Sequence, residues 1–316
     1  MKSWVIGGRG LLGSSVRDEL LKSNVVWNQN MQIGWAKNNA DQELEFQKAS
    51  IFAAVNEFAS IVKDSNWAIY WCAGIGVVSS PSEILKIEEI AMMNFLDALR
   101  ESNHLDLARG RIFYASSAGG VYADSVNPPF NEETSTNPVS PYGFHKIYME
   151  SLLTSFGVES GTTIIRGRIA NLYGVGQNSS KQQGLITTLV RRAMLNQTLN
   201  IYVPLQTTRN YIYTTDAARQ IVSLTECSEK ENEVVIVGSS NNWSISSILK
   251  MTQEVTKKKL KVSLSSNAMT KYQPIDLRLA SLVSKTEISN REVPFAIAVN
   301  YIKHGIMSQI REGSAR

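Results

Sequence analysis

Three features are scarce in this sequence, and each scarcity excludes a class of protein. The two cysteines, Cys72 and Cys227, lack metal-ligand spacing and are too few for a disulfide scaffold. No stretch is apolar over the length that a bilayer-spanning helix needs. Charge of one sign is scarce as well. The 32 lysines and arginines face 28 acidic residues, and a net charge of +4 is too small and scattered to indicate nucleic-acid binding.

The remaining composition is that of an ordinary globular protein. Hydrophobic residues make up 43% of the 316 residues and charged residues 19%, which fits one large domain or a large domain with a smaller one. The strand-like run Trp4–Ile6 follows the first residues directly and leaves no room for a signal peptide. We therefore expect a cytoplasmic protein that binds no nucleic acid, no membrane and no metal.

Apolar runs typical of buried strands alternate with helical patterns in the first half of the chain. Strands are expected at Ser3–Ile6, Val25–Trp27, Trp67–Trp71, Arg111–Ala115, Thr163–Arg168 and, later, Val234–Val237. Helices are expected between them at Leu12–Lys22, Ile51–Lys63, Glu83–Glu101 and Tyr142–Phe156. This alternation predicts an α/β fold with a doubly wound parallel sheet, the Rossmann arrangement.

The rhythm changes beyond residue 170. A loop rich in Gly, Asn, Ser and Gln covers 174–184, and helices are expected at Leu185–Asn196 and Ile245–Lys257. We expect the chain to return to the main sheet near Asn210–Tyr213 and Val234–Val237. The sequence thus predicts a Rossmann domain over 1–170, with returns near 210–237, and a smaller lobe, mainly 171–316, that binds substrate.

A glycine-rich loop joins the first expected strand to the first helix. Gly7, Gly10 and Gly13 follow the pattern Gly-x-x-Gly-x-x-Gly, which permits a tight turn and close approach of a pyrophosphate. The pyrophosphate then lies at the positive end of the helix, against the backbone of Leu11 and Leu12. The position between a strand and a helix predicts a nicotinamide dinucleotide site.

The residues around this loop indicate which dinucleotide is bound. An acidic residue after the second strand would hold the ribose 2′-hydroxyl of NAD, but Val25–Trp27 runs into Asn28 with no carboxylate nearby. Arg9 projects from the glycine loop, where a guanidinium can pair with a 2′-phosphate. Both features favour NADP, with NAD as the alternative.

Tyr142 and Lys146 are four residues apart in an expected helix and so share one face. A phenol with its ordinary pKa near ~10 is a poor base at neutral pH. A nearby ammonium favours the phenolate and lowers that pKa, which makes Tyr142 a usable acid or base. Ser116 and Ser117 end an expected strand, where a hydroxyl can bond to a substrate oxygen.

With these motifs the sequence resembles the extended short-chain dehydrogenase/reductase family, and within it the nucleotide-sugar epimerases, dehydratases and 4-ketoreductases. The resemblance extends over nearly the whole chain. It is carried by the segments Ser116–Tyr122 (SSAGGVY), Ser140–Lys146 (SPYGFHK), Arg168–Gly174 (RIANLYG), Gln183–Ile186 (QGLI) and Thr208–Ile212 (TRNYI).

The resemblance assigns the catalytic roles. It implies that Tyr142 is the acid/base and that Lys146 lowers the pKa of Tyr142 and holds the nicotinamide ribose. It implies that Ser117 orients the reacting oxygen.

The same resemblance implies the binding residues. Asn171 is expected to contact the nucleotide diphosphate and Arg209 its phosphates, and Ser116 is expected on the substrate side. Ala73 and Gly74 are expected to line the cofactor.

The chain departs from the family's pattern at several positions. Ala118 stands where many members carry Ser or Thr, so Ser116 is an alternative for the role of Ser117. Asn210 replaces a usual Asp, and Ala49 with Ser50 replaces a stretch where an Asp often meets the adenine. Glu88 occupies a position where epimerases often carry Asn near the nicotinamide.

The expected substrate is a sugar carried by a nucleotide diphosphate, with the reaction at carbon 4. Two versions remain open, a 4-keto sugar reductase that consumes NADPH and a 4-epimerase that recycles its cofactor. The features favouring NADP tilt the prediction slightly toward the reductase. A dehydratase fits less well, because Gly119 and Gly120 replace its acidic pair. A cofactor-sensing regulator or a reductase of free carbonyl compounds is more remote.

Two further expectations concern the histidines and the assembly. His104, His145 and His304 are expected to be non-catalytic, with His145 on the surface of its helix. Apolar stripes on Glu83–Glu101 and Tyr142–Phe156 resemble the helices that build a four-helix dimer interface in the family, which implies a homodimer.

Overall fold

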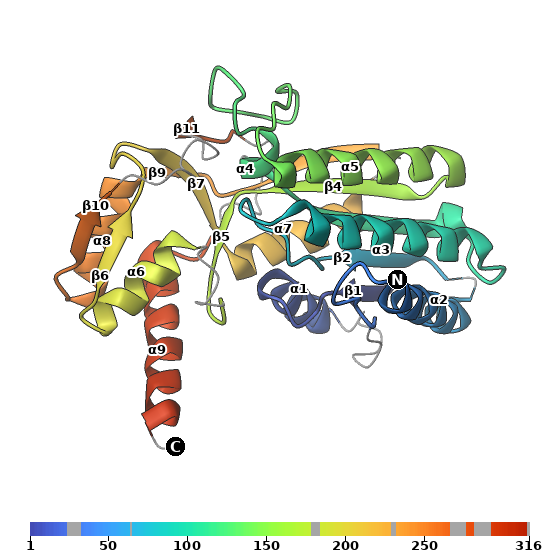
Figure 1. The fold of residues 1–316 in the computed structure, drawn as a ribbon, viewed down its shortest axis with the longest axis horizontal. Coiled ribbons are helices and arrows are strands. Elements are labelled where there is room, and N and C mark those ends of the chain that lie inside the picture. Colours follow the sequence, from blue (N-terminus) through green and yellow to red (C-terminus); the bar gives the residue numbers. More distant parts are fainter. Residues whose placement is uncertain are drawn as a thin grey trace.

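A parallel sheet of five strands forms the centre of the molecule in the described part of the chain (Figure 1). The structure, a computed structural model, describes residues 1–23, 33–63, 65–177, 184–228, 232–265, 276–280 and 292–314. In spatial order the strands are β1 (Lys2–Ile6), β2 (Trp67–Trp71), β3 (Gly110–Ser117), β4 (Thr163–Ile169) and β8 (Asn232–Val237). The predicted doubly wound fold is confirmed, while the expected strand Val25–Trp27 and Asn28 lie outside the described residues.

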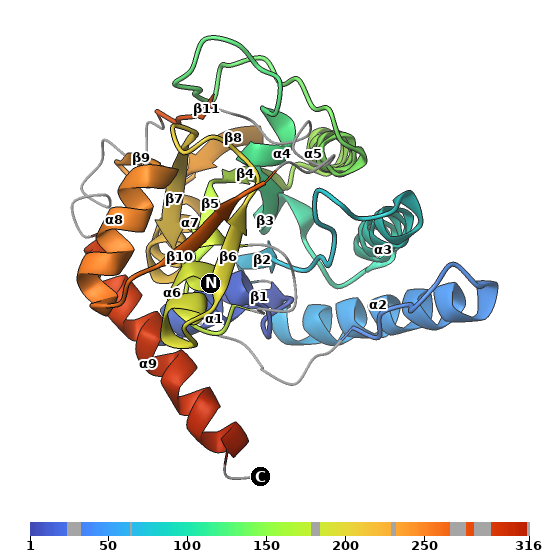
Figure 2. The same ribbon diagram turned by 60° about the vertical axis from the view of Figure 1, so that its left-hand side comes forward.

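Helices cover both faces of this sheet (Figure 2). One face carries α2 (Asp41–Val62), α3 (Ser82–Glu101) and α5 (Pro141–Ser160), and the other carries α1 (Leu11–Lys22) and α7 (Thr214–Cys227). A 3₁₀ turn at Leu107–Arg109 precedes β3, and the short helix α4 (Ala118–Val121) follows this strand. The result is a three-layer sandwich with an apolar core on each side of the sheet.

Strand β2 shows how its sequence selects a central position. All five residues are buried, with Trp67, Ile69 and Trp71 in the core under α2, α3 and α5. Ala68 and Tyr70 alternate with them and lie in the core under α1 and α7. Successive strand residues point to opposite faces, so a continuous apolar run fits a strand that helices cover on both sides.

A smaller lobe lies beside the central sheet (Figure 1). Its sheet contains β5 (Asn171–Tyr173), β7 (Thr208–Tyr213), β9 (Asn242–Ser244) and β11 (Asp276–Leu277). A separate apolar core joins α6 (Leu185–Met194), α8 (Ile245–Thr256) and α9 (Phe295–Ser314). A two-stranded sheet pairs β6 (Thr198–Ile201) with β10 (Lys261–Leu264).

One expected strand belongs to a different sheet from the one predicted. Val234–Val237 lies in the central sheet, but the prediction that Asn210–Tyr213 returns to it is wrong, because this segment belongs to β7 of the lobe. The strand next to β4 in the central sheet is β8. The last contact of the chain with β8 is the hydrogen bond from Ala170 N to Val237 O at 2.9 Å, and the chain then enters the lobe.

The helix predictions differ from the structure at the start of one helix and omit two others. Helix α2 begins at Asp41, not at Ile51, because its first turns are solvent-exposed helix formers with Gln47 as their one buried side chain. Helices α7 and α9 were not predicted. In α7 the signal was present, since the buried residues Ala217 and Ile221 are four positions apart. Among the described helices, none is both long and apolar enough to span a membrane.

Helix α5 is fixed to the sheet by a buried ion pair. The guanidinium of Arg168 on β4 donates two hydrogen bonds to the Glu150 carboxylate on α5, at 2.8 and 3.2 Å. Ser116 Oγ on β3 donates to the same carboxylate at 2.6 Å. The side chains of Arg168 and Glu150 are 9% and 4% exposed. Buried charges of this kind require partners, so the cluster fixes α5 against β3 and β4.

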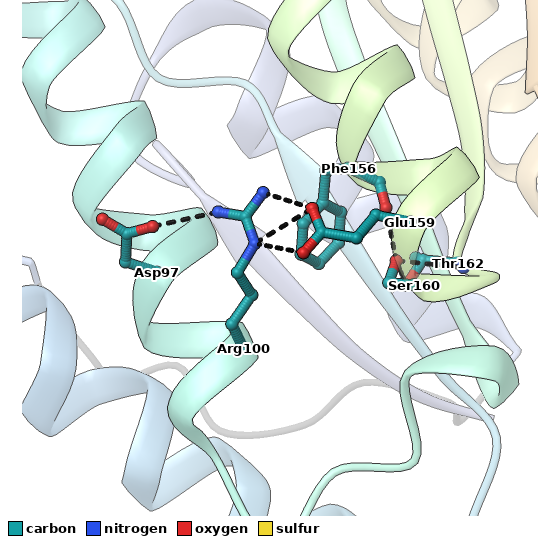
Figure 3. Close-up of polar contacts among 6 residues, drawn as sticks. All are labelled: Asp97, Arg100, Phe156, Glu159, Ser160 and Thr162. Carbon is teal, nitrogen blue, oxygen red and sulfur yellow. Dashed lines mark hydrogen bonds and ion pairs between the residues drawn. The ribbon is translucent and has the colours of Figure 1, made fainter.

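An exposed ion pair between α3 and α5 differs from this buried one (Figure 3). Arg100 of α3 lies between Asp97 and Glu159, with distances of 2.9 and 2.8 Å from its Nη1 and Nη2 to their carboxylates. Cζ of Arg100 lies over the Phe156 ring, 5.2 Å from the centroid of that ring. The Glu159 side chain is 59% exposed, and solvent screens such a pair.

We predict that Glu150→Ala lowers the free energy of unfolding by about 3–5 kcal/mol, because it leaves the Arg168 guanidinium buried without its carboxylate. Urea unfolding of the wild type and the variant measures the loss. Glu159→Ala removes a carboxylate from the same helix and is expected to cost much less. Equal losses in the two variants would contradict the anchoring role of Glu150.

Candidate active site

The carboxyl ends of the central strands meet at one edge of the sheet, and the glycine loop lies there. Gly7 follows β1 directly with φ +85°, and a Cβ at this position would lie 2.6 Å from Ala73 N after β2. A Cβ at Gly13 would lie 2.2 Å from Gly7 O. The spacing of the glycines therefore lets α1 start directly against two loops.

The first turn of α1 offers an anion site. Backbone N–H groups of Leu11, Leu12 and Gly13 lack intrahelical acceptors because they lie in the first turn, and the N-cap residue Gly10 has no side chain to accept from them. Such groups and the helix dipole favour a phosphate. Arg9 is exposed on the loop. The backbone of this turn fits the pyrophosphate of a nicotinamide dinucleotide. Asn28 lies outside the described residues.

The sequence at the start of α5 explains where this helix begins. Ser140 is the N-cap, its Oγ accepts a hydrogen bond from Gly143 N at 3.1 Å, and Pro141 occupies the first turn. Tyr142 and Lys146 follow in the first two turns. The helix ends at Gly161, whose φ of +72° is the left-handed conformation of a C-cap glycine.

Lys146 is buried and held in one position. Its Nζ donates to the Tyr114 hydroxyl at 3.1 Å and to the Ala115 carbonyl at 3.3 Å, and it lies 5.5 Å from the centroid of the Tyr142 ring. Burial alone lowers the pKa of Lys146. The neighbouring oxygens of Tyr114, Tyr142 and Glu88 outweigh burial and raise this pKa, so the ammonium persists next to Tyr142 at neutral pH.

The two serines at the end of β3 face different surroundings. Ser117 Oγ accepts a hydrogen bond from Gly120 N at 3.2 Å, and a Cβ at Gly120 would lie 3.2 Å from Cε1 of Tyr142. The structure thus brings Gly120 of α4 next to Tyr142, and Ser117 is hydrogen-bonded to this same glycine. It does not bring Ser116 there, because the Ser116 hydroxyl is buried and bonded to Glu150.

Asn171 and Arg209 come from neighbouring strands of the lobe. Asn171 follows the end of β4, and its Nδ2 donates to the Asn210 carbonyl on β7 at 2.9 Å. Arg209 is half-buried on β7, where burial lowers its pKa and Tyr211 partly offsets the effect. Both residues therefore belong to the sheet of the smaller lobe, which the chain enters directly after β4.

Sequence reasoning misplaced one residue next to this site and missed the role of another. His145 was expected on the helix surface, but this is wrong because its side chain is 1% exposed and lies 3.2 Å from both Glu88 and Glu89 of α3. Asn210 appeared only as a departure from the family pattern. Its side chain is buried and bonds to the backbone of Ser239 and Asn241, which fixes the loop after β8.

No group of three or more His, Cys, Asp or Glu residues in the described ranges is arranged to hold a metal ion.

Two curated relatives are similar to this chain. A putative UDP-glucose 4-epimerase of Methanocaldococcus jannaschii is 28% identical over 247 residues, which is 77% of this chain and 79% of that protein. The dTDP-4-dehydro-6-deoxyglucose reductase of Escherichia coli is 28% identical over 149 residues, which is 47% of this chain and 46% of that protein.

Two solved structures share the fold. A UDP-glucose 4-epimerase of Thermus thermophilus in complex with NAD has a TM-score of 0.77 at 18% identity, over 97% of this chain and 99% of that chain. RMD from Pseudomonas aeruginosa complexed with NADPH has a TM-score of 0.76 at 19% identity, over 98% of both chains. At these identities the likeness shows the fold alone.

The family follows from the sequence match. The model of the NAD dependent epimerase/dehydratase family matches residues 4–238, which include the glycine loop, both serines, Tyr142 and Lys146. The chain therefore belongs to the NAD dependent epimerase/dehydratase family and is an enzyme of the extended short-chain dehydrogenase/reductase type.

Proposed function

We propose that the enzyme catalyses hydride exchange at carbon 4 of a hexose carried by a nucleotide diphosphate. The observation that carries the proposal is the arrangement of Tyr142 and Lys146, with a buried ammonium 5.5 Å from the phenol ring at the edge of the sheet that also holds the glycine loop. A nicotinamide cofactor, when bound there, supplies or accepts the hydride.

The chain's own residues handle the proton. The Tyr142 hydroxyl exchanges a proton with the oxygen on carbon 4. The Lys146 ammonium stabilises the Tyr142 phenolate that exists while the proton is on the sugar oxygen. Ser117 Oγ already accepts a hydrogen bond from Gly120 N, so its own hydrogen is directed to another acceptor. We assign that acceptor as the reacting oxygen, which Ser117 orients toward Tyr142.

The lobe would bind the nucleotide. Arg209 places a half-buried guanidinium on β7, and Asn171 on the neighbouring strand β5 donates a hydrogen bond to the Asn210 carbonyl. A cation and an amide in adjoining strands suit the charge and the oxygen acceptors of a diphosphate.

Among the two reactions that fit this site, the 4-epimerase has the broader support. The similar epimerase of M. jannaschii is matched over 79% of its length, whereas the E. coli reductase is matched over 46%. The 4-keto sugar reductase with NADPH, favoured by the sequence, is the second candidate. Its support is Arg9, which is exposed on the cofactor loop where a 2′-phosphate would need a cation.

A homodimer remains a proposal. Phe144 and Tyr148 on α5 are 59% and 40% exposed, and these large apolar side chains lie on the helix that the sequence assigns to a dimer interface.

We predict that Tyr142→Phe leaves the Kd of the nicotinamide cofactor within about twofold and lowers kcat by about a hundredfold or more, because the substitution removes only the proton-transfer group. Fluorescence titration measures the first quantity and turnover of a nucleotide-sugar panel the second. Tyr148→Phe, a change on the exposed face of the same helix, is the control and should keep wild-type activity. A Tyr142→Phe enzyme with most of its activity would refute the assignment.

We predict that Arg209→Ala weakens binding of the preferred nucleoside diphosphate by about 1.5–3 kcal/mol, the range for a hydrogen bond to a charged group. Calorimetry with UDP, dTDP and GDP identifies that nucleotide and measures the loss. Arg278→Ala removes an exposed guanidinium near the neighbouring strand β11 and should change binding little. Unchanged affinity in Arg209→Ala would remove Arg209 from the phosphate site.

A third prediction separates epimerase from reductase through the cofactor. An epimerase returns the same hydride and gains from retaining its cofactor, so we expect denatured, freshly purified enzyme to release about one NAD per chain. Enzymatic cycling assays specific for NAD and NADP measure the release. If the protein carries no NAD and oxidises NADPH with a 4-keto sugar nucleotide, the reductase is the correct version.

A further inference from the structure

The loop that follows β2 is held by one carboxylate. Glu88 Oε1 on α3 accepts hydrogen bonds from Ile75 N at 2.6 Å and from Gly76 N at 2.8 Å. A Cβ at Gly74 would lie 3.3 Å from Glu88 Oε2, so the loop passes directly over this side chain. Ala73 in the same loop lies against Gly7 of the glycine loop. Glu88 thus supports the loop that the sequence assigns to the cofactor.

The other oxygen of this carboxylate faces the helix that carries Tyr142. Glu88 Oε2 lies 3.2 Å from His145 Nε2, and Glu89 Oε1 lies 3.2 Å from His145 Nδ1 on the opposite side of the ring. Glu89 also pairs with Lys86 at 3.3 Å on its own helix. Glu88 therefore lies against two other elements, the loop after β2 and α5.

The charge of Glu88 also acts on Lys146. Burial alone raises the pKa of Glu88, but His145, Lys146 and the two backbone N–H groups outweigh burial and lower it. In return, the Glu88 carboxylate is one of the groups that raise the pKa of Lys146. Lys146 contacts Tyr114 as well, and its ammonium lies near Tyr142. A neutral side chain at position 88 would not provide this charge.

We propose that Glu88 is a positioning residue that couples the cofactor-lining loop to helix α5 and places its negative charge against His145, the chain neighbour of Lys146. Its Oε1 accepts the two hydrogen bonds from the loop, and its Oε2 lies 3.2 Å from His145 Nε2 of α5. The proposal rests on the proposed function for the roles of Tyr142 and Lys146. The hydrogen bonds to the loop affect cofactor binding whatever the sugar substrate is.

The first test measures cofactor binding without any sugar nucleotide. After any co-purified nicotinamide is removed, NADH and NADPH are titrated into the wild type, Glu88→Ala, Glu88→Gln and the matched control Glu89→Gln. Glu88→Ala should raise the Kd of the preferred cofactor about tenfold or more, because two hydrogen bonds to the loop are lost. Glu88→Gln keeps an oxygen acceptor and should raise the Kd less, and Glu89→Gln should stay within about twofold of the wild type.

Melting curves show whether each variant is folded. If Glu88→Ala is not, the comparison of Glu88→Gln with Glu89→Gln carries the test through the second readout. Glu88 is one of the groups that raise the pKa of Lys146, so Glu88→Gln should lower that pKa. The midpoint of the pH–rate profile should then move to lower pH. Glu89→Gln should leave that midpoint unchanged.

Two results would overturn the proposal. One is a Kd in folded Glu88→Ala equal to that of the wild type. The other is a pH–rate profile that is the same in Glu88→Gln and Glu89→Gln. An enzyme that binds cofactor as described but turns over no nucleotide sugar would instead contradict the proposed function and leave the loop assignment standing.

Discussion

The buried ion pair between Glu150 and Arg168 is the contact on which the arrangement of the site depends. The Arg168 guanidinium and the Glu150 carboxylate are removed from water and bond to each other, and Ser116 donates to the same carboxylate, so the cluster ties α5 to β3 and β4. The same helix carries Tyr142 and Lys146 toward the carboxyl ends of the strands. The buried ion pair thereby determines where Tyr142 and Lys146 lie at the carboxyl edge of the sheet.

Three further contacts fix the N-terminal half of α5. Ser140 caps its first turn, His145 lies between two carboxylates of α3, and Lys146 bonds to the end of β3. Through Glu88 these contacts reach the loop that lies against Gly7. The glycine loop, the loop after β2, α5 and the strand ends thus form one connected structure that holds the candidate site residues in fixed positions.

Local patterns predicted the described central strands and the shared helix face of Tyr142 and Lys146, because both follow from residues close together in the sequence. Trp67–Trp71 is apolar throughout and therefore fits a strand covered on both faces, and the spacing of Tyr142 and Lys146 places them on one face of α5. Long-range choices were beyond such reasoning. The strand at Asn210–Tyr213 carries no mark of which sheet it joins, and the burial of His145 depends on carboxylates 56 and 57 positions earlier in the chain.

The central claim is that cofactor and nucleotide sugar meet at Tyr142. A crystal structure with NAD and the nucleotide sugar that most raises the melting temperature tests it most directly. The account predicts the cofactor pyrophosphate at the N-terminus of α1 and the oxygen on carbon 4 of the sugar within hydrogen-bonding distance of the Tyr142 hydroxyl. A sugar that presents another carbon to Tyr142, or a cofactor bound away from the glycine loop, would contradict it.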